Sequence, residues 1–140
     1  MGNRALVCFK NSDTITPAVY IHWCNDRVPQ YIGALKRRMI GREGDAQYAC
    51  ARFCGMMHDR IKGNLSLGII DHPITLFDAN NDHKPEVLKR LRDASHGDAG
   101  FVIVDTKDFT WKAYGGYLEG YVPQDRKNRK TSGKAVSGIA

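Results

Sequence analysis

The sequence predicts a single α+β domain, in which an antiparallel or mixed sheet of about five strands carries helices packed on one face. The chain has 140 residues, of which 42% are hydrophobic and 26% are charged, and these values are typical of one globular domain. Strand patterns gather near both ends of the chain, and helix patterns occupy the middle. No strand–helix–strand alternation of the kind that builds a fully parallel sheet is present.

The first two strands are expected to form a hairpin. Residues 4–10 and 17–23 are rich in β-branched and aromatic residues, as strands are. The polar run 11–14 between them is typical of a turn.

Alternation along the second strand assigns its side chains to two faces. Tyr20 and His22 share one face, and Ile21 and Trp23 share the other. Because Ile21 is apolar, we expect Trp23 to lie in the core and His22 to lie on an accessible face.

Two amphipathic helices follow. Apolar residues recur at helical spacing over residues 28–39, with Pro29 in the first turn and Gly41 at the end. A second helix is expected over residues 46–61, with Asp45 as its N-cap. The short loop between the helices predicts antiparallel neighbours.

The rest of the domain contains one more helix and three more strands. Residues 65–70 predict a strand that lies centrally in the sheet, because its end is continuously apolar. The polar segment 71–84 is expected to be a loop, followed by a short helix over residues 85–92. Residues 101–105 and 109–114 predict a second hairpin. The expected order is strand, strand, helix, helix, strand, helix, strand, strand.

Charge separates the chain into two parts. Residues 125–140 contain five Lys or Arg and one acid, which leaves only +2 of the formal charge of +6 for the first 124 residues. We expect residues 1–123 to form the domain and residues 124–140 to form a basic disordered tail. No signal peptide and no apolar run long enough to span a bilayer is visible, so we expect a cytoplasmic protein without a membrane partner.

Two polar clusters are candidate binding sites. One lies at the end of the second strand, and the other lies in the loop before the last hairpin, where His96 and Asp98 could pair as an oriented base. Ordinary strand packing and turn formation explain the same residues, and no nucleophile motif accompanies them, so no catalytic residue is assigned. The candidate binding residues are Tyr20, His22, Asn25, Asp26, His96 and Asp98.

We expect no metal site. Cys50, Cys54 and His58 follow one another at intervals of four on one helix. Residues eight apart are separated by about 12 Å along a helix, whereas a zinc ion reaches its ligands at about 2.3 Å.

A second apparent metal motif fails as well. The segment 78–82 begins like a calcium-binding loop, but His83 and Lys89 stand where the loop needs glycine and glutamate. Nucleotide-binding glycine motifs are also missing from the sequence, so we expect no cofactor.

Five segments carry a resemblance to known proteins, namely residues 2–5, 19–23, 48–53, 63–68 and 96–100. Through them, most of residues 2–117 resembles a family of small uncharacterised bacterial proteins that look like cargo of prophages and other mobile elements. The family has no established function, so the resemblance implies no activity.

The sequence leaves three hypotheses of function open. The first is a non-enzymatic accessory protein that binds a host or mobile-element macromolecule, a protein rather than a nucleic acid. The second is a small hydrolase or transferase that uses His22, His96 and Asp98, and it requires these side chains to converge in one pocket. The third is a nucleic-acid-binding module that uses the basic tail together with the cluster at residues 36–38. The sequence does not indicate an oligomeric state.

Overall fold

The structure is a computed structural model that describes residues 3–23, 25–60 and 66–121. The predicted tail at residues 124–140 lies outside the described residues. Within the three described ranges, no helix is both long enough and apolar enough to cross a membrane.

The described residues form a five-stranded mixed sheet, as the α+β prediction requires. Its strands are β1 (Ala5–Lys10), β2 (Ala18–Ile21), β3 (Gly68–Ile70), β4 (Gly100–Asp105) and β5 (Thr110–Tyr114). Their order across the sheet is β3-β2-β1-β4-β5. The central pair, β1 and β4, is parallel, and the other neighbours are antiparallel. The predicted fold class is therefore confirmed.

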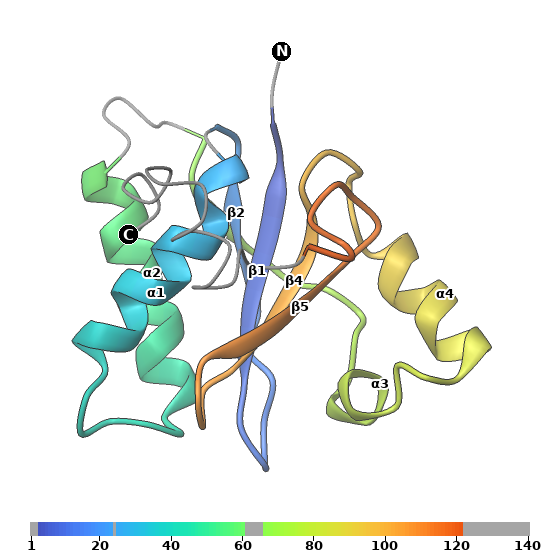
Figure 1. The fold of residues 1–140 in the computed structure, drawn as a ribbon, viewed down its shortest axis with the longest axis horizontal. Helices are drawn as coiled ribbons and strands as arrows, with labels where there is room; N and C mark the ends of the chain where they lie inside the picture. The colour runs from blue at the N-terminus through green and yellow to red at the C-terminus, as the bar shows by residue number, and fades with distance from the viewer. Residues whose placement is uncertain (1–2, 24, 61–65, 122–140) are drawn as a thin grey trace, which may run out of the picture.

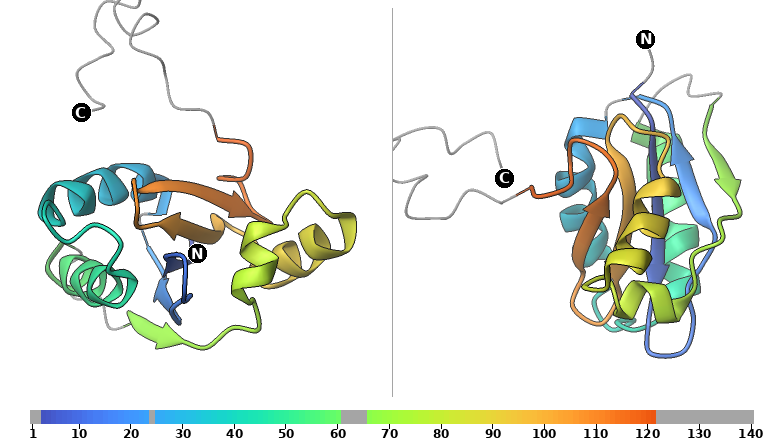
Figure 2. Two further views of the ribbon diagram at one scale, coloured as in Figure 1. Left: turned by 90° about the horizontal axis from the view of Figure 1, so that it is seen from below. Right: turned by 90° about the vertical axis from the view of Figure 1, so that its right-hand side faces the viewer.

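The helices cover both faces of this sheet. They are α1 (Val28–Arg38), which follows the 3₁₀ turn η1 (Asn25–Arg27), then α2 (Ala46–Arg60), α3 (Leu76–Asn80) and α4 (Pro85–Asp93). Figures 1 and 2 show α1 and α2 on one side and α3 and α4 on the other. The detail that all helices pack on one face was therefore wrong.

Two cores explain why both faces need a cover. Val7 and Val102 of the central strands enter the core under α1 and α2, whereas Leu6 and Phe101 enter the core under α3 and α4. Alternate residues of a strand point to opposite faces, so a central strand that is apolar throughout needs helices on both sides. The continuous apolar runs of β1 and β4 already contained this signal.

The segment predicted to be a loop contains α3. Thr75 caps this helix: its hydroxyl accepts a hydrogen bond from the backbone N–H of Asp78, and the Asp78 carboxylate accepts one from the backbone N–H of Thr75. The helix is only five residues long, and its apolar residues are too few to produce a periodic pattern.

Two further predictions about strands were wrong. β3 lies at the edge of the sheet beside β2 rather than centrally, and Ile69 is exposed there. Trp23 is 42% exposed, although Ile21 is fully buried as expected. Strand β2 ends at Ile21, so the alternation of faces does not extend to Trp23.

Candidate functional site

The structure brings three of the candidate residues together at one end of the sheet. The hydroxyl oxygen of Tyr20 lies 2.7 Å from Nδ1 of His22. The ring of His96, from the loop after α4, meets the Tyr20 ring edge-on with 5.9 Å between the centroids. Trp23 extends this cluster, because its ring lies 4.6 Å from that of His22. An aromatic and imidazole cluster of Tyr20, His22, Trp23 and His96 therefore lies where β2 ends.

Asp98 does not pair with His96. Its carboxylate instead accepts hydrogen bonds from the backbone N–H and from Nε of Arg4, both at 2.9 Å. The Arg4 side chain lowers the pKa of Asp98 below its usual value and also donates to the backbone oxygen of His96. Asp98 has a φ of 48°, a left-handed conformation that aspartate tolerates better than most residues. The pair therefore fixes the loop and orients no imidazole.

Asn25 has a structural position. It is fully buried, and its amide group donates to the backbone oxygens of Asn3 and Ile21. These bonds tie the start of β1 to the end of β2. Asp26, beside it in η1, is exposed. Asn25 and Asp26 thus do not contribute a shared pocket with the imidazoles.

Cys50, Cys54 and His58 line one surface cavity, but among the described residues they do not form a metal-binding group. Cys50 is buried and donates from Sγ to the backbone oxygen of Pro17, while His58 is exposed. In the calcium-like segment, Asp78 caps α3. Within the described part of the chain, no group of three or more His, Cys, Asp or Glu side chains could hold a metal ion.

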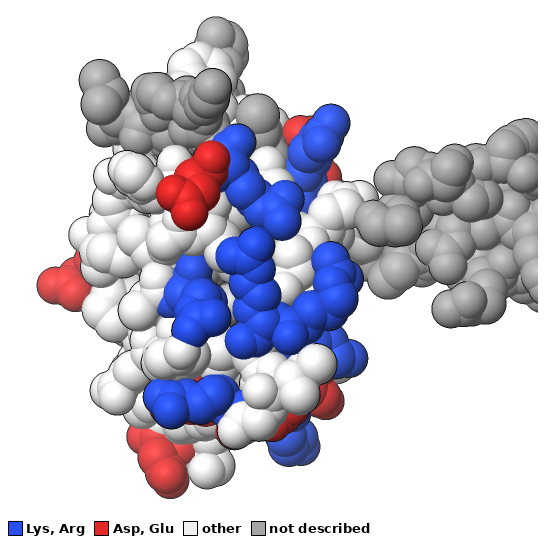
Figure 3. All heavy atoms as spheres, turned by 90° about the vertical axis from the view of Figure 1, so that its left-hand side faces the viewer, with Lys and Arg blue, Asp and Glu red and all other residues white. Residues whose placement is uncertain are grey.

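The exposed surface of α1 and α2 is basic. Residues 28–60 contain six Lys or Arg and only three Asp or Glu. Figure 3 shows these cations gathered over α1 and α2, and we call this surface the basic face. Its cationic residues are Lys36, Arg37, Arg38, Arg42, Arg52 and Arg60.

Two arginines of the basic face lie against one aromatic ring. The guanidinium carbons of Arg42 and Arg52 lie 3.9 Å and 4.7 Å from the centre of the Tyr48 ring. Arg52 also donates a hydrogen bond to the Tyr48 hydroxyl. Arg38, Tyr48 and Arg52 line one surface cavity of about 450 Å³.

The structure places further cations beside the cluster at residues 36–38, and the sequence alone did not indicate that they lie together. The sequence drew attention only to residues 36–38 of α1, because a run of three cations is conspicuous. Arg42 lies in the loop between the helices, and Arg52 and Arg60 are spaced along α2, so only the packing of α2 beside α1 gathers them. Arg42 also pairs with Asp45 at 3.2 Å, and stacking on Tyr48 restricts the guanidinium groups of both Arg42 and Arg52. A guanidinium group has five N–H donors, so both arginines keep donors that can bind an anion.

No family model, curated protein or solved structure matches this chain. The resemblance to small bacterial proteins of mobile elements therefore stays an expectation from the sequence.

Proposed function

We propose that the protein is a non-enzymatic nucleic-acid-binding module that holds a phosphate backbone on the basic face. The observation that carries this proposal is the placement of Arg42 and Arg52 against Tyr48, inside a surface with twice as many cations as acids. Arginine binds phosphate through paired N–H groups, and a guanidinium held on an aromatic ring loses less conformational entropy on binding than a free one.

The charge distribution favours a nucleic acid over a protein as the partner. The first 124 residues carry a net charge of only +2, yet residues 28–60 carry +3, so the positive charge of the folded part is concentrated on α1 and α2. A segregated basic surface is the electrostatic footprint of a polyanion ligand. Phosphate contacts of this kind supply affinity without sequence specificity.

Binding of a fluorescent 20-nucleotide RNA or DNA strand, measured by anisotropy at several salt concentrations, tests the proposal. The variant Arg42→Ala/Arg52→Ala should bind about tenfold or more weakly, with a salt slope reduced by about 2. The matched control is Lys84→Ala/Lys89→Ala, which removes two cations at α4, on the opposite side of the sheet, and should change affinity by less than about threefold.

Equal losses in the two double variants would contradict the proposal, because binding would then follow net charge alone. A chain that ends at residue 123 separates the contribution of the tail. The effect of the Arg42→Ala/Arg52→Ala variant should persist in that shortened chain.

The aromatic and imidazole cluster favours a second candidate function, a small hydrolase or transferase that uses His22 and His96 as acid or base groups. The supporting observation is the contact of Tyr20 with both rings. A hydrogen bond at Nδ1 of His22 fixes that ring and leaves its other nitrogen for proton transfer. Asp98 does not take part in this acid–base chemistry, because its carboxylate forms an ion pair with Arg4.

Chromogenic esters and phosphodiesters test this second candidate. Turnover that is lost in His22→Gln, with an unchanged melting temperature, would support it. Failure of the unaltered protein to turn over either substrate class counts against it.

A further inference from the structure

A polar cavity lies on the face opposite α1 and α2, between α3 and the strands β4 and β5. Its volume is about 330 Å³. The cavity reaches the carboxyl ends of the parallel strands β1 and β4, where Lys10 and Asp105 are register partners. From these ends the chain leaves in opposite directions, to β2 and to β5. Open sheets bind small ligands at such positions.

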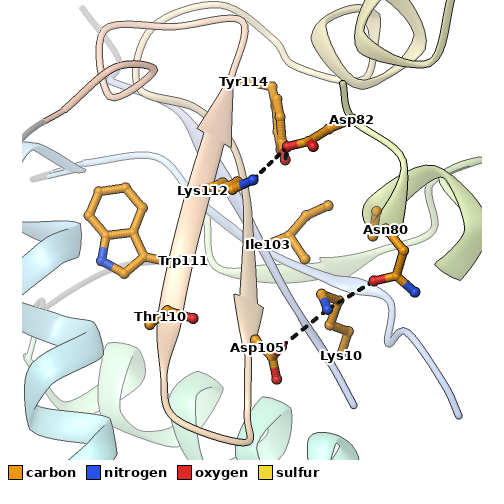
Figure 4. Close-up of a pocket in the computed structure, with 10 residues that line it drawn as sticks. Lys10, Asn80, Asp82, Ile103, Asp105, Thr110, Trp111, Lys112 and Tyr114 are labelled. Carbon is orange, nitrogen blue, oxygen red and sulfur yellow. Dashed lines mark hydrogen bonds and ion pairs between the residues drawn. The ribbon is translucent and has the colours of Figure 1, made fainter. Parts of the chain in front are cut away.

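Two polar clusters line this cavity, and Ile103 lies between them (Figure 4). In the first, Nζ of Lys10 donates to Oδ1 of Asn80 and Oδ2 of Asp105, both at 3.2 Å. Lys10 belongs to β1, Asn80 to α3 and Asp105 to β4, so three separate elements meet here.

The second cluster is centred on Asp82, in the turn after α3. Its Oδ2 accepts hydrogen bonds from Nζ of Lys112 at 3.0 Å and from the hydroxyl of Tyr114 at 2.8 Å. Figure 4 shows Lys112 and Tyr114 reaching toward Asp82 from β5, while Trp111 points away from the cavity. The cavity wall is therefore made of hydrogen-bonding groups around the apolar side chain of Ile103.

The charges of the cavity balance within each cluster. Lys10 pairs with Asp105, and Lys112 pairs with Asp82. The four groups together carry no net charge, so the cavity has no excess charge that would attract an anion or a cation. A neutral ligand keeps both pairs intact.

Hydrogen-bonding capacity remains after these pairs have formed. An ammonium group has three donors, so Lys10 keeps one N–H and Lys112 keeps two. Among the described residues, Oδ1 of Asp82 accepts no hydrogen bond. The cavity thus offers donors and an acceptor side by side. A hydroxyl group, which donates and accepts at once, matches such a mixture.

The wall is also held in place before any ligand binds. Arg90 of α4 contacts Asp78 at 2.6 Å and thereby fixes α3 against α4. Burial opposes ionisation of Asp82, but the hydrogen bonds from Tyr114 and Lys112 outweigh it and lower the pKa of this carboxyl group. Burial and the neighbouring Asp82 raise the pKa of Tyr114, so its hydroxyl remains a donor.

We propose that the cavity between α3 and β4–β5 binds a small neutral ligand rich in hydroxyl groups, through Lys10, Asn80, Asp82 and Lys112. Vicinal hydroxyls bridge the carboxylate of Asp82 and the two ammonium groups, and the carbon skeleton of the ligand packs on Ile103. Two sources carry this chemistry, namely the ribose of a nucleoside and a free sugar.

Titration of the ¹⁵N-labelled full-length protein with adenosine and D-glucose, followed by amide chemical shifts, tests the proposal. At least one probe should shift the signals of Lys112 and Tyr114 saturably. A response to adenosine alone identifies the nucleoside as the source, and a response to glucose identifies the free sugar. Because this cavity and the basic face lie on opposite sides of the sheet, the result does not depend on nucleic-acid binding.

The variant Lys112→Ala should weaken binding about tenfold, since it removes a charged donor. The Lys112 side chain is 70% exposed, so the melting temperature should hardly change. Lys89→Ala on α4 is the matched control and should bind the probe as the unaltered protein does.

Three outcomes would overturn the proposal. They are the absence of saturable shifts with both neutral probes, equal affinity of Lys112→Ala, and binding of AMP or glucosamine at Lys112 more than about tenfold tighter than their neutral counterparts. The last result would show that the site recognises charge.

Discussion

Arg90 of α4 holds the buried carboxylate of Asp78 on α3 through its Nε and one terminal nitrogen, with a shortest distance of 2.6 Å. The same carboxylate also caps the start of α3 through the backbone N–H of Thr75. One side chain thus stabilises a five-residue helix that has little stability of its own. The floor of the hydroxyl-binding cavity depends on this pair.

Replacing Asp78 by Asn should lower the free energy of unfolding by about 2 kcal/mol, because the amide cannot serve both Arg90 and the helix cap as the carboxylate does. Denaturant unfolding of the two proteins at pH 6 measures the difference. A loss below about 0.5 kcal/mol would contradict this role of Asp78.

The effect of Asp78 should depend on pH. Burial opposes its ionisation, but the hydrogen bonds from Arg90 and Thr75 outweigh burial and lower its pKa in the folded protein. As the pH falls below about 4, Asp78 becomes protonated in the unfolded chain before it does in the folded protein. The stabilisation by its carboxylate is therefore lost progressively as the pH falls toward the lowered pKa of the folded protein. Unfolding curves at pH 6 and pH 3 should therefore show a larger loss for the unaltered protein than for Asp78→Asn.

Two glycines should respond in opposite ways to replacement by Ala. A Cβ at Gly116 would lie 2.4 Å from the backbone oxygen of Asp98, whereas a Cβ at Gly55 would meet no atom within 4 Å. Gly116→Ala should cost about 3 kcal/mol, because backbone must shift. Gly55→Ala should add about 1 kcal/mol through the helix propensity of alanine in α2. Thermal unfolding of both variants decides the matter, and a stable Gly116→Ala protein would speak against the close approach.

Ile21 and Trp23 differ in burial, and stability should follow this difference. Ile21 is fully buried, so Ile21→Ala should cost about 3–4 kcal/mol. Trp23 is 42% exposed, and Trp23→Ala should cost about 1 kcal/mol or less. Paired denaturation curves measure both changes, and the reverse ranking would contradict the end of β2 at Ile21.

Arg4 should control the ionisation of Asp98. Its side chain is the main cause of the lowered pKa of Asp98, and its backbone N–H adds to the effect. Arg4→Met removes only the side chain, so the pKa of Asp98 should rise part of the way toward its ordinary value of about 4. Carboxyl NMR titration measures this shift. Arg92→Met, which removes a cation paired with Glu119 instead, should leave Asp98 unchanged.

The sequence predicted the main elements because their signals are local. Apolar spacing over residues 28–39 and Asp45 before the second helix predicted α1 and α2, and two β-rich pairs predicted the terminal hairpins. Polar clusters within one short segment were harder to interpret, since His96 and Asp98 are close in sequence but contact different partners. Hydrogen bonds to Arg4, 94 residues away, decide the orientation of Asp98.

By itself, the sequence determined the class of the fold, the strand-rich ends and the helical middle, because periodicity and turn residues act over a few positions. Only the tertiary structure decided that β1 and β4 pair in parallel, and hence that Lys10 meets Asp105 across 95 residues. It also decided that α2 brings Arg52 beside Arg38. These contacts join residues that are far apart in the chain. Their closeness in space follows from how the two cores pack, and no local sequence pattern encodes that packing.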